Sequence, residues 1–395
     1  MTSGHIALQG VKLVVASTHT APYKASVWRH LSEVYGVDLT VLYAAMHGAE
    51  QYNDPLFNRP ILWDVPVLEG YPWKRLHNRP MAWLNRRCAY NVPGLEQVLA
   101  EGRFTHLLLE GKEYLYYHQA LRAARKLGMK TLYRAESHPA KGNWILEQIA
   151  RASRRAWYRG IDHFLCVGRY QYEEYAEFGI GRDRMFFSPY CVDDERFSAQ
   201  HNEAMVHRQR IRRGYGFSDD TLVVGYSGKL YDRKNPMELV RAMGQLPEGA
   251  RLGLLVVGDG PMRGEVEQVA RATSKGPLAF TGFLNQSKLA EAYTAMDMFV
   301  MPSLWETWGL VLNEAMICGL PVIATTGVNA ARDLITDGVN GFTYASGDEA
   351  ALADRILRVA ASVRSGGVMG VASQMLIRDY SVTRACRGIV ESLCA

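Results

Sequence analysis

The chain has 395 residues, more than one ordinary core holds, which predicts two domains. Hydrophobic residues make up 48% and charged residues 22%, a globular balance that excludes a largely disordered chain. The net charge is a mild +5, and the basic residues are not arranged as a recognition helix or a stacking sheet, which argues against nucleic-acid binding.

Apolar runs and cysteines exclude further classes. No run approaches the roughly 20 apolar residues of a membrane-spanning helix, and the first ten residues do not resemble a signal peptide, so we expect a cytoplasmic protein. The six cysteines are scattered without a Cys-x-x-Cys pair, so we predict neither a metal site nor a disulfide framework.

Short apolar runs rich in β-branched residues alternate with helical patterns, which predicts parallel sheets flanked by helices. In the first half we expect strands at 12–17, 38–43, 106–109, 130–133 and 163–167, and helices at 26–34, 115–127, 143–159 and 171–178. In the second half we expect strands at 222–227, 252–257, 278–281, 298–301 and 321–324, with helices such as 236–243 and 311–318. The predicted fold is α/β, with two facing Rossmann-like, doubly wound parallel-sheet domains and an inter-domain cleft. Weak periodicity and high charge place the junction at 193–218.

Two segments of the first half combine basic and aromatic residues. They contain Lys74, Arg75, Arg79, Arg86 and Arg87 beside Trp73 and Trp83, and Arg151, Arg154, Arg155 and Arg159 around Trp157 and Tyr158. Such surfaces either rest on anionic lipid, bind an acidic acceptor, or are ordinary solvated helix faces.

Two glycine turns follow predicted strands of the second half. After 222–227, Gly228 allows backbone to approach a ligand, and Lys229 and Lys234 place two cations there that suit a diphosphate. Ordinary surface lysines are the alternative. After 252–257 come Gly258 and Gly260, but Arg263 stands where a dinucleotide fingerprint needs its third glycine, so a redox site is not predicted. This second turn either lines the cleft near a nucleotide or is purely structural.

Two acidic residues flank the start of the helix predicted at 311–318. Glu306 lies in the loop before it and Glu314 within it, so their carboxylates are roughly 10–12 Å apart at about 1.5 Å per helical residue. One carboxylate could then bind sugar hydroxyls and the other ribose hydroxyls, while the amides of 308–310 face a diphosphate. Two unrelated surface glutamates are the alternative.

In this order and spacing, the motifs resemble family 4 of the retaining glycosyltransferases, group 1, whose two-domain architecture is called GT-B. The resemblance extends to 280–283, 297–303, 319–324 and 337–342, and more loosely to a hinge-like segment at 188–193. It implies an acceptor-binding domain at 1–195, closed by a C-terminal helix at 379–395, and a donor-binding domain at 196–378.

The resemblance also implies an activity. A hexose would move with retention, and without a metal, from a nucleotide-diphosphate sugar, UDP-sugar favoured, to an acceptor hydroxyl in glycan, lipopolysaccharide or natural-product biosynthesis. Lys229 and Lys234 would bind the diphosphate, Glu306 the transferred sugar and Glu314 the ribose. The other donor-side positions are Ser227, Gly228, Gly258, Gly260, Phe283, Thr307, Trp308, Gly309 and Leu310.

The first domain departs more from the family. The histidine expected near the reacting carbon is either shifted to His138 or replaced by Arg134 or Glu136. The acceptor-side candidates are His19, Tyr23, Arg134, Glu136, Trp63 and Trp73, the last two from an aromatic segment at 54–73. The acceptor is a small molecule, a glycan or a lipid-linked saccharide, and no cofactor is expected beside the sugar nucleotide. A sugar phosphorylase, a nucleotide-sugar epimerase and a non-catalytic sugar-binding module remain alternatives, and the protein either stays in solution or contacts the inner face of a membrane peripherally.

Overall fold

The computed structural model describes the whole chain except residues 1–7, 55, 57–58, 82–85 and 137–143. Its contacts divide the chain into two compact units. Unit 1 comprises Met1–Tyr52, Pro66–Tyr190 and Val382–Ala395, and unit 2 comprises Asn53–Val65 and Cys191–Ser381.

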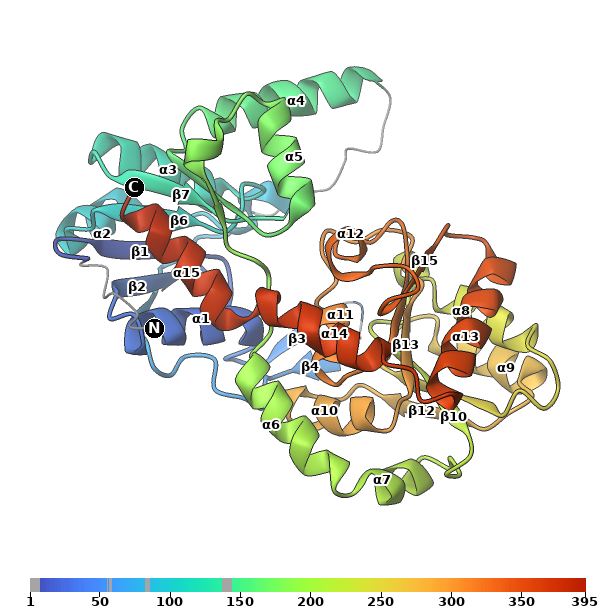
Figure 1. Cartoon of the computed structure of the whole chain (residues 1–395). Helices are drawn as coiled ribbons and strands as arrows, with labels where there is room; N and C mark the ends of the chain where they lie inside the picture. The colour runs from blue at the N-terminus through green and yellow to red at the C-terminus, as the bar shows by residue number, and fades with distance from the viewer. Residues whose placement is uncertain (1–7, 55, 57–58, 82–85, 137–143) are drawn as a thin grey trace. The chain divides into compact units, whose positions relative to one another are not determined.

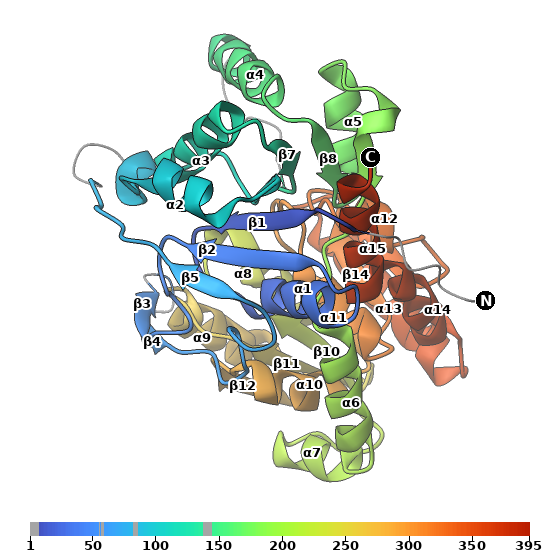
Figure 2. The ribbon, with the colours of Figure 1, turned by 90° about the vertical axis from the view of Figure 1, so that its left-hand side faces the viewer.

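Unit 1 is built on a seven-stranded sheet with the order β5-β2-β1-β6-β7-β8-β9 (Figure 1). Neighbouring strands are parallel, because each connection crosses over through a helix or a long loop. The strands are β1 (Lys12–Ser17), β2 (Asp38–Tyr43), β5 (Trp73–Arg75), β6 (His106–Leu109), β7 (Lys130–Tyr133), β8 (His163–Cys166) and β9 (Met185–Phe187). The helices are α1 (Pro22–Glu33), α2 (Leu95–Gly102), α3 (Leu115–Lys126), α4 (Trp144–Tyr158), α5 (Arg169–Glu177) and α15 (Val382–Leu393). The C-terminal α15 packs on α1 and β9 (Figure 2), so the predicted closing helix belongs to unit 1.

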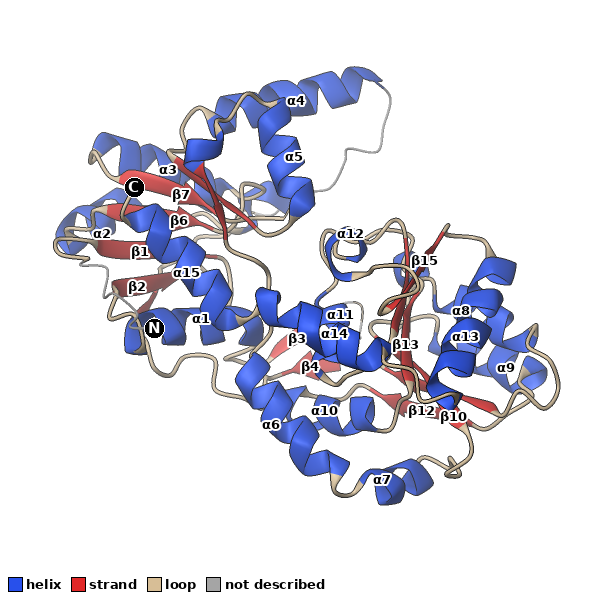
Figure 3. Ribbon diagram, viewed as in Figure 1, coloured by secondary structure: helices blue, strands red, loops and turns tan. Residues whose placement is uncertain are grey.

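Unit 2 contains a six-stranded parallel sheet with the order β12-β11-β10-β13-β14-β15 and helices on its faces (Figure 3). Its strands are β10 (Leu222–Ser227), β11 (Leu252–Val257), β12 (Leu278–Gly282), β13 (Met298–Met301), β14 (Val322–Thr325) and β15 (Gly341–Tyr344). Its helices are α6 (Asp194–Met205), α7 (Arg208–Gly214), α8 (Pro236–Gly244), α9 (Arg263–Thr273), α10 (Gln286–Thr294), α11 (Leu310–Ile317), α12 (Ala331–Leu334), α13 (Glu349–Arg364) and α14 (Met369–Ile377). A small two-stranded sheet pairs β3 (Tyr52–Asp54) with β4 (Arg59–Ile61).

The α/β prediction with two parallel sheets is confirmed, but the junction differs from the prediction. The region 193–218 contains α6 and α7, and the predicted boundary at 195–196 lies inside α6. Polar contacts hold these helices, which explains the weak apolar periodicity. Arg212 of α7 is buried and donates to Asp297 Oδ2 at 2.8 Å and to the Ala295 carbonyl at 2.9 Å.

One segment of the predicted first domain belongs to the other unit. Residues 53–65 belong to unit 2, where the Asn285 side chain donates to the Leu62 carbonyl at 2.7 Å and the Ser287 amide donates to Asp64 Oδ1 at 3.1 Å. The aromatic segment predicted as one acceptor wall is therefore divided. Trp63 lies in unit 2, whereas Trp73 is an exposed residue of β5 in unit 1.

Candidate functional site

The two glycine turns of unit 2 lie against each other at the carboxyl ends of β10 and β11. The Gly228 amide donates to the Val257 carbonyl at 2.9 Å, and the Leu230 amide donates to the Asp259 carbonyl at 2.9 Å. Gly258 has a φ of +138°, and a Cβ there would lie 1.9 Å from the Gly228 carbonyl oxygen. A Cβ on Gly260 would lie 2.4 Å from the Leu230 carbonyl oxygen. Close packing of the two loops is therefore enough to require Gly258 and Gly260.

Lys234 and Glu306, predicted from separate motifs, form an ion pair. Lys234 ends a short 3-10 turn (Asp232–Lys234) after β10, and its Nζ lies 2.7 Å from Glu306 Oε1. Glu306 is buried in the loop after β13, where its amide donates to the Gly327 carbonyl at 3.0 Å and its carbonyl accepts from the Asn329 amide at 3.2 Å. Both charges are thus held at the carboxyl edge of the sheet, next to α11.

Lys229 pairs with an acid that the sequence did not indicate as its partner. Its Nζ donates to Asp54 Oδ2 at 2.6 Å, and Asp54 is buried at the end of β3. The same segment brings the Arg59 guanidinium over the ring of Phe283, 5.1 Å from its centroid. Two predicted donor-side residues, Lys229 and Phe283, therefore contact the segment 53–65.

Glu314 is a buried acid inside α11. Tyr293 of α10 donates from its hydroxyl to Glu314 Oε2 at 2.8 Å. Burial raises the pKa of Glu314 to about 7, although the Tyr293 hydrogen bond and the charge of Arg196 oppose the shift. Glu314 therefore changes its charge near neutral pH. Tyr293 is a neighbour that sequence reasoning missed, because a tyrosine at the end of an amphipathic helix is ordinarily a core residue.

The first turn of α11 is fixed by a glycine and an indole. Gly309 precedes the helix with a φ of +120°. Trp308 is buried, and its Nε1 donates to Asn313 Oδ1 at 3.0 Å. The buried indole therefore stabilises the first turn of α11. Of the predicted positions 307–310, Trp308 therefore offers a ligand only its backbone. Leu310 starts the helix and Thr307 is half-buried in the loop.

In unit 1, His19 and Tyr23 lie in and just after the loop that follows β1. His19 Nδ1 lies 2.9 Å from Thr18 Oγ1, and burial, followed by the positive charge of Lys24, lowers the pKa of His19 to about 3. His19 is therefore neutral at physiological pH. Tyr23 packs edge-on against Tyr190, with ring centroids 6.1 Å apart.

A buried ion pair that the sequence did not indicate lies beside these residues. Lys24 Nζ lies 3.1 Å from Glu110 Oε2, and both side chains are almost completely withdrawn from solvent.

Arg134 is bound to the hinge-like segment. The buried guanidinium donates from Nε to Ser188 Oγ at 3.0 Å and from Nη2 to the Pro189 carbonyl at 2.6 Å, and lies 4.9 Å from the Tyr190 ring centroid. These contacts give Arg134 a structural role in joining β7 to the chain after β9. Glu136 is half-buried, and its charge contributes to raising the pKa of Tyr190, after burial. His138 lies outside the described residues.

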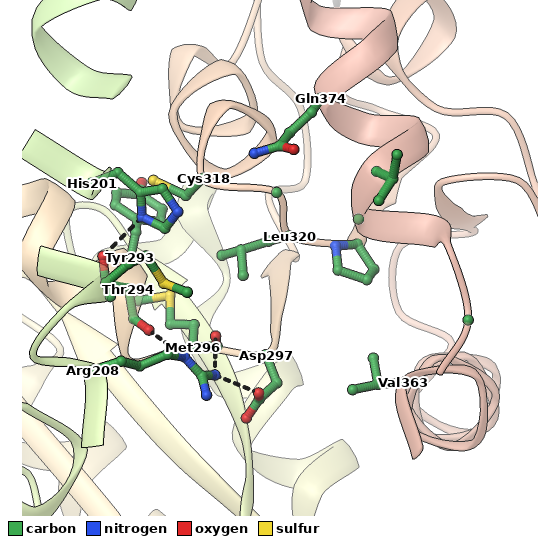
Figure 4. Close-up of a pocket in the computed structure, with 16 residues that line it drawn as sticks. His201, Arg208, Tyr293, Thr294, Met296, Asp297, Cys318, Leu320, Val363 and Gln374 are labelled. Atoms are coloured by element: carbon green, nitrogen blue, oxygen red, sulfur yellow. Dashed lines mark hydrogen bonds and ion pairs between the residues drawn. The ribbon is translucent and has the colours of Figure 1, made fainter. Parts of the chain in front are cut away.

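A pocket of unit 2 lies away from these residues. It has a volume of about 380 Å³ and is lined at the amino ends of β13 and β14 by residues such as Asp297 and Leu320 (Figure 4). Its polar side chains bind one another. Arg208 donates to Asp297 Oδ1 at 2.6 Å, and His201 Nδ1 lies 2.8 Å from Thr294 Oγ1. Because ligands of parallel sheets bind at the carboxyl ends of strands, this pocket is not the candidate site.

No group of three or more His, Cys, Asp or Glu side chains in the described part of the chain could hold a metal ion. None of the helices there is long and apolar enough to cross a membrane.

Unit 2 also matches a known family over most of its length. The family described as Glycosyl transferases group 1 matches residues 207–363, which include the glycine turns, both lysines and both glutamates. Residues 207–363 are therefore similar to the glycosyltransferases of group 1. This finding confirms the resemblance of the second half to the glycosyltransferases of group 1.

Curated relatives align with part of the chain. The 2-deoxystreptamine glucosyltransferase of Streptomyces kanamyceticus is 33% identical over 187 residues, 47% of this chain and 47% of that protein. The GDP-mannose-dependent alpha-mannosyltransferase of Mycobacterium tuberculosis is 33% identical over 235 residues, 58% of this chain and 57% of that protein. The chain thus spans about half the length of the curated relatives it matches.

A solved structure shows the same fold over nearly the whole chain. Anabaena Alr3699/HepE in complex with UDP has a TM-score of 0.73 and 18% identity, and the match covers 97% of this chain and 99% of that one. The predicted GT-B fold is confirmed. At this identity the likeness concerns the fold alone.

Proposed function

We propose that the protein is a metal-independent, retaining glycosyltransferase that moves a hexose from a nucleotide-diphosphate sugar to an acceptor hydroxyl. The main support is the ion pair between the half-buried Lys234 and the buried Glu306 at the carboxyl edge of the unit 2 sheet, within the group 1 match. A cation and a carboxylate held side by side suit a donor that carries a phosphate next to a sugar. Glu306 would accept hydrogen bonds from sugar hydroxyls while Lys234 binds the adjoining phosphate.

The proposed chemistry depends on charge stabilisation. As the bond between the anomeric carbon and the phosphate oxygen breaks, the bonding electrons leave with the diphosphate. Lys229, Lys234 and the amides at the start of α11 would stabilise that charge, as preorganised donors do at developing anions. The acceptor oxygen forms the new bond from the same face, and its proton passes to a phosphate oxygen, so no protein base is required. In this scheme the lysines and amides supply the positive charge that a metal supplies elsewhere.

Two different nucleotides are named among the similar proteins. Alr3699/HepE was solved with UDP and with UDP-glucose, whereas the mycobacterial relative is named as GDP-mannose-dependent. We favour a UDP-sugar because the chain matches Alr3699/HepE over nearly its full length. The acceptor side would lie in unit 1, around His19, Tyr23 and Glu136. We propose a cytoplasmic protein with peripheral contact at the inner face of a membrane.

A calorimetric screen with UDP-, GDP- and ADP-sugars in the presence of EDTA tests the donor proposal. We expect one nucleotide to bind in EDTA and Lys234→Ala to weaken that binding. The matched control is Lys288→Ala, which removes an exposed lysine of α10 that pairs with Glu291 at 3.3 Å. Absence of binding to all three donors, or equal loss in the two variants, would refute the proposal. Retention would be read from the anomeric coupling of the product by NMR, and release of a sugar phosphate without nucleotide would indicate a phosphorylase instead.

A further inference from the structure

Tyr293 links helix α10 to Glu314 in α11. The Tyr293 hydroxyl donates to Glu314 Oε2 at 2.8 Å, and bulk water hardly reaches the pair, since Tyr293 is fully buried and Glu314 is 8% exposed. Burial, followed by the charge of Glu314, raises the pKa of Tyr293 well above its usual value, and the Ser227 side chain opposes the shift. The phenol therefore keeps its proton at physiological pH and offers it to the carboxylate.

The ring of Tyr293 is held on two sides. It packs edge-on against Phe197 of α6, with ring centroids 5.8 Å apart, and in a tilted contact against Phe299 of β13, with centroids 5.6 Å apart. The next residue, Thr294, has its hydroxyl 2.8 Å from His201 Nδ1, so the end of α10 is tied to α6 (Figure 4). A side chain fixed in this way orients its hydrogen-bond partner before a ligand arrives.

Few charged groups in the described residues act on Glu314. Of the elements around α11, α6 contributes Arg196 and α10 contributes Tyr293, whereas α14, β13 and β14 contain no ionisable residue. Cys318, one turn later in α11, remains a neutral thiol, because burial and then the charge of Glu314 raise its pKa well above the usual value. Burial is the largest influence on Glu314 itself and raises its pKa to about 7, although Tyr293 and Arg196 oppose the shift. About half of the molecules therefore carry a proton on Glu314 at pH 7.

A ribose would favour the ionised form of Glu314. Its two hydroxyls have hydrogens to donate, and an ionised carboxylate offers acceptor sites on both oxygens, whereas the protonated acid has lost part of that capacity. Because Oε2 already accepts from Tyr293, the loss matters more here. Hydrogen bonds to a charged acceptor are also roughly twice as strong as those between neutral groups.

We infer that Tyr293 is a positioning residue, which holds the Glu314 carboxylate for the ribose of the nucleotide, and that nucleotide binding releases the Glu314 proton. This assignment rests on the proposed function, because it places the ribose at Glu314. The proton passes to the buffer, while the carboxylate accepts from Tyr293 through Oε2 and from the ribose through its other oxygen. The affinity for the nucleotide therefore rises with pH until Glu314 is ionised in the free protein, and is constant above that pH. With a midpoint near 7, the ionised fraction grows about tenfold between pH 6 and pH 8.

Isothermal titration of UDP between about pH 6 and about pH 8 tests this linkage. We expect the ratio of the UDP affinity to the affinity for 2′,3′-dideoxy-UDP, which lacks both ribose hydroxyls, to rise about tenfold over this range. The ratio is needed because a terminal phosphate titrates near pH 6, and the two compounds share it. In two buffers of different ionisation enthalpy, UDP should release about half a proton more than the dideoxy compound at pH 7.

Tyr293→Phe keeps the ring and removes only the hydroxyl. Because the hydrogen bond from Tyr293 lowers the pKa of Glu314, its loss should move the rise in UDP affinity to higher pH and weaken UDP about tenfold at pH 7. Binding of 2′,3′-dideoxy-UDP should change less. Equal weakening of both compounds at every pH would mean that Tyr293 has only a structural role. Glu314→Gln should make the affinity ratio independent of pH.

The matched control is Tyr344→Phe, which removes the hydroxyl of a buried tyrosine of β15 beside a different acid, Glu238. Its UDP affinity and pH profile should equal those of the unchanged protein. The proton count of the unchanged protein decides the outcome even where circular dichroism shows that a variant does not fold. A ratio independent of pH in the unchanged protein would overturn the assignment of Tyr293 and Glu314 while the donor proposal stands. Absence of binding by UDP, GDP and ADP at every pH would overturn both.

Discussion

The ion pair between Lys229 and Asp54 makes a directional prediction about donor binding. If Lys229 binds the diphosphate, an incoming donor must replace the Asp54 carboxylate, whose Oδ2 lies 2.6 Å from the lysine Nζ. A hydrogen bond to a charged group contributes about 1.5–3 kcal/mol. The lysine side chain is 28% exposed, which places this pair at the lower end of that range. Asp54→Asn keeps the shape of the side chain and the oxygen that accepts from the Leu56 amide at 2.9 Å. We therefore expect UDP to bind about tenfold more tightly, since about 1.4 kcal/mol corresponds to a factor of ten.

Isothermal titration of UDP into the unchanged protein and the Asp54→Asn variant measures this difference. Asp64→Asn is the control, because it removes another carboxylate from the same segment. Asp64 accepts from the Ser287 amide and hydroxyl and binds no lysine in the described contacts. Its affinity for UDP should stay within about twofold of the unchanged protein. The gain in Asp54→Asn should shrink at high salt, because screening weakens a partly exposed ion pair.

The opposite result would also be informative. Weaker UDP binding in Asp54→Asn would mean that Asp54 holds Lys229 in place for the donor, which refutes competition between carboxylate and diphosphate. An unchanged affinity for UDP in a Lys229→Ala variant would show that Lys229 does not bind the donor.

Three further predictions concern the rest of unit 2. Lys234→Ala should lower kcat at least about 10²-fold, which is the loss expected when one preorganised hydrogen-bond donor is removed. Steady-state kinetics of this single variant, in which Glu306 is unchanged, measures the effect. Because burial raises the pKa of Glu314 to about 7, the folded state holds a proton that the unfolded state releases above about 4.5. The contribution of Glu314 to the free energy of unfolding is therefore complete below pH 4.5. It is lost as pH rises through 7, and the loss amounts to up to about 3 kcal/mol. In Glu314→Gln, the free energy of unfolding measured by urea titration should no longer fall between about pH 4.5 and pH 7. A fall as large as in the unchanged protein would show that Glu314 is not the group responsible. Gly258→Ala should destabilise unit 2 by more than about 3 kcal/mol in thermal unfolding, because its Cβ would collide with the Gly228 carbonyl.

The central strands of both sheets could be predicted from the sequence, whereas several edge elements could not. Strands such as β1 and β11 are buried on both faces and read as continuous apolar runs. β5 contains Trp73, Lys74 and Arg75, all exposed, so its sequence indicates a basic surface loop. Its place in the sheet comes from parallel pairing with β2, which no local pattern encodes.

The places of the charged residues in the fold could be predicted from the sequence, whereas their partners could not. Lys234, Glu306 and Glu314 lie on loops and a helix whose positions follow from the strand order. The partners Asp54 and Tyr293 come from segments far along the chain, and only tertiary packing brings them to Lys229 and Glu314. For Asp54 the sequence offered no signal, because it stands in a turn-rich stretch of the first half that crosses to unit 2.

The glycines and the charges of the motifs carry different information. Gly258 and Gly260 are required by contact between two loop backbones, with or without a ligand, so a glycine pattern predicts how the sheet edge is built. Lys234 and Glu306 have no such structural necessity. An ion pair that is largely withdrawn from water loses hydration, and such a pair is often replaceable by apolar residues at no cost in stability. The presence of a lysine and a glutamate at this edge is therefore better explained by a ligand that needs both charges, and this difference is why the proposed function depends on the pair and not on the glycines.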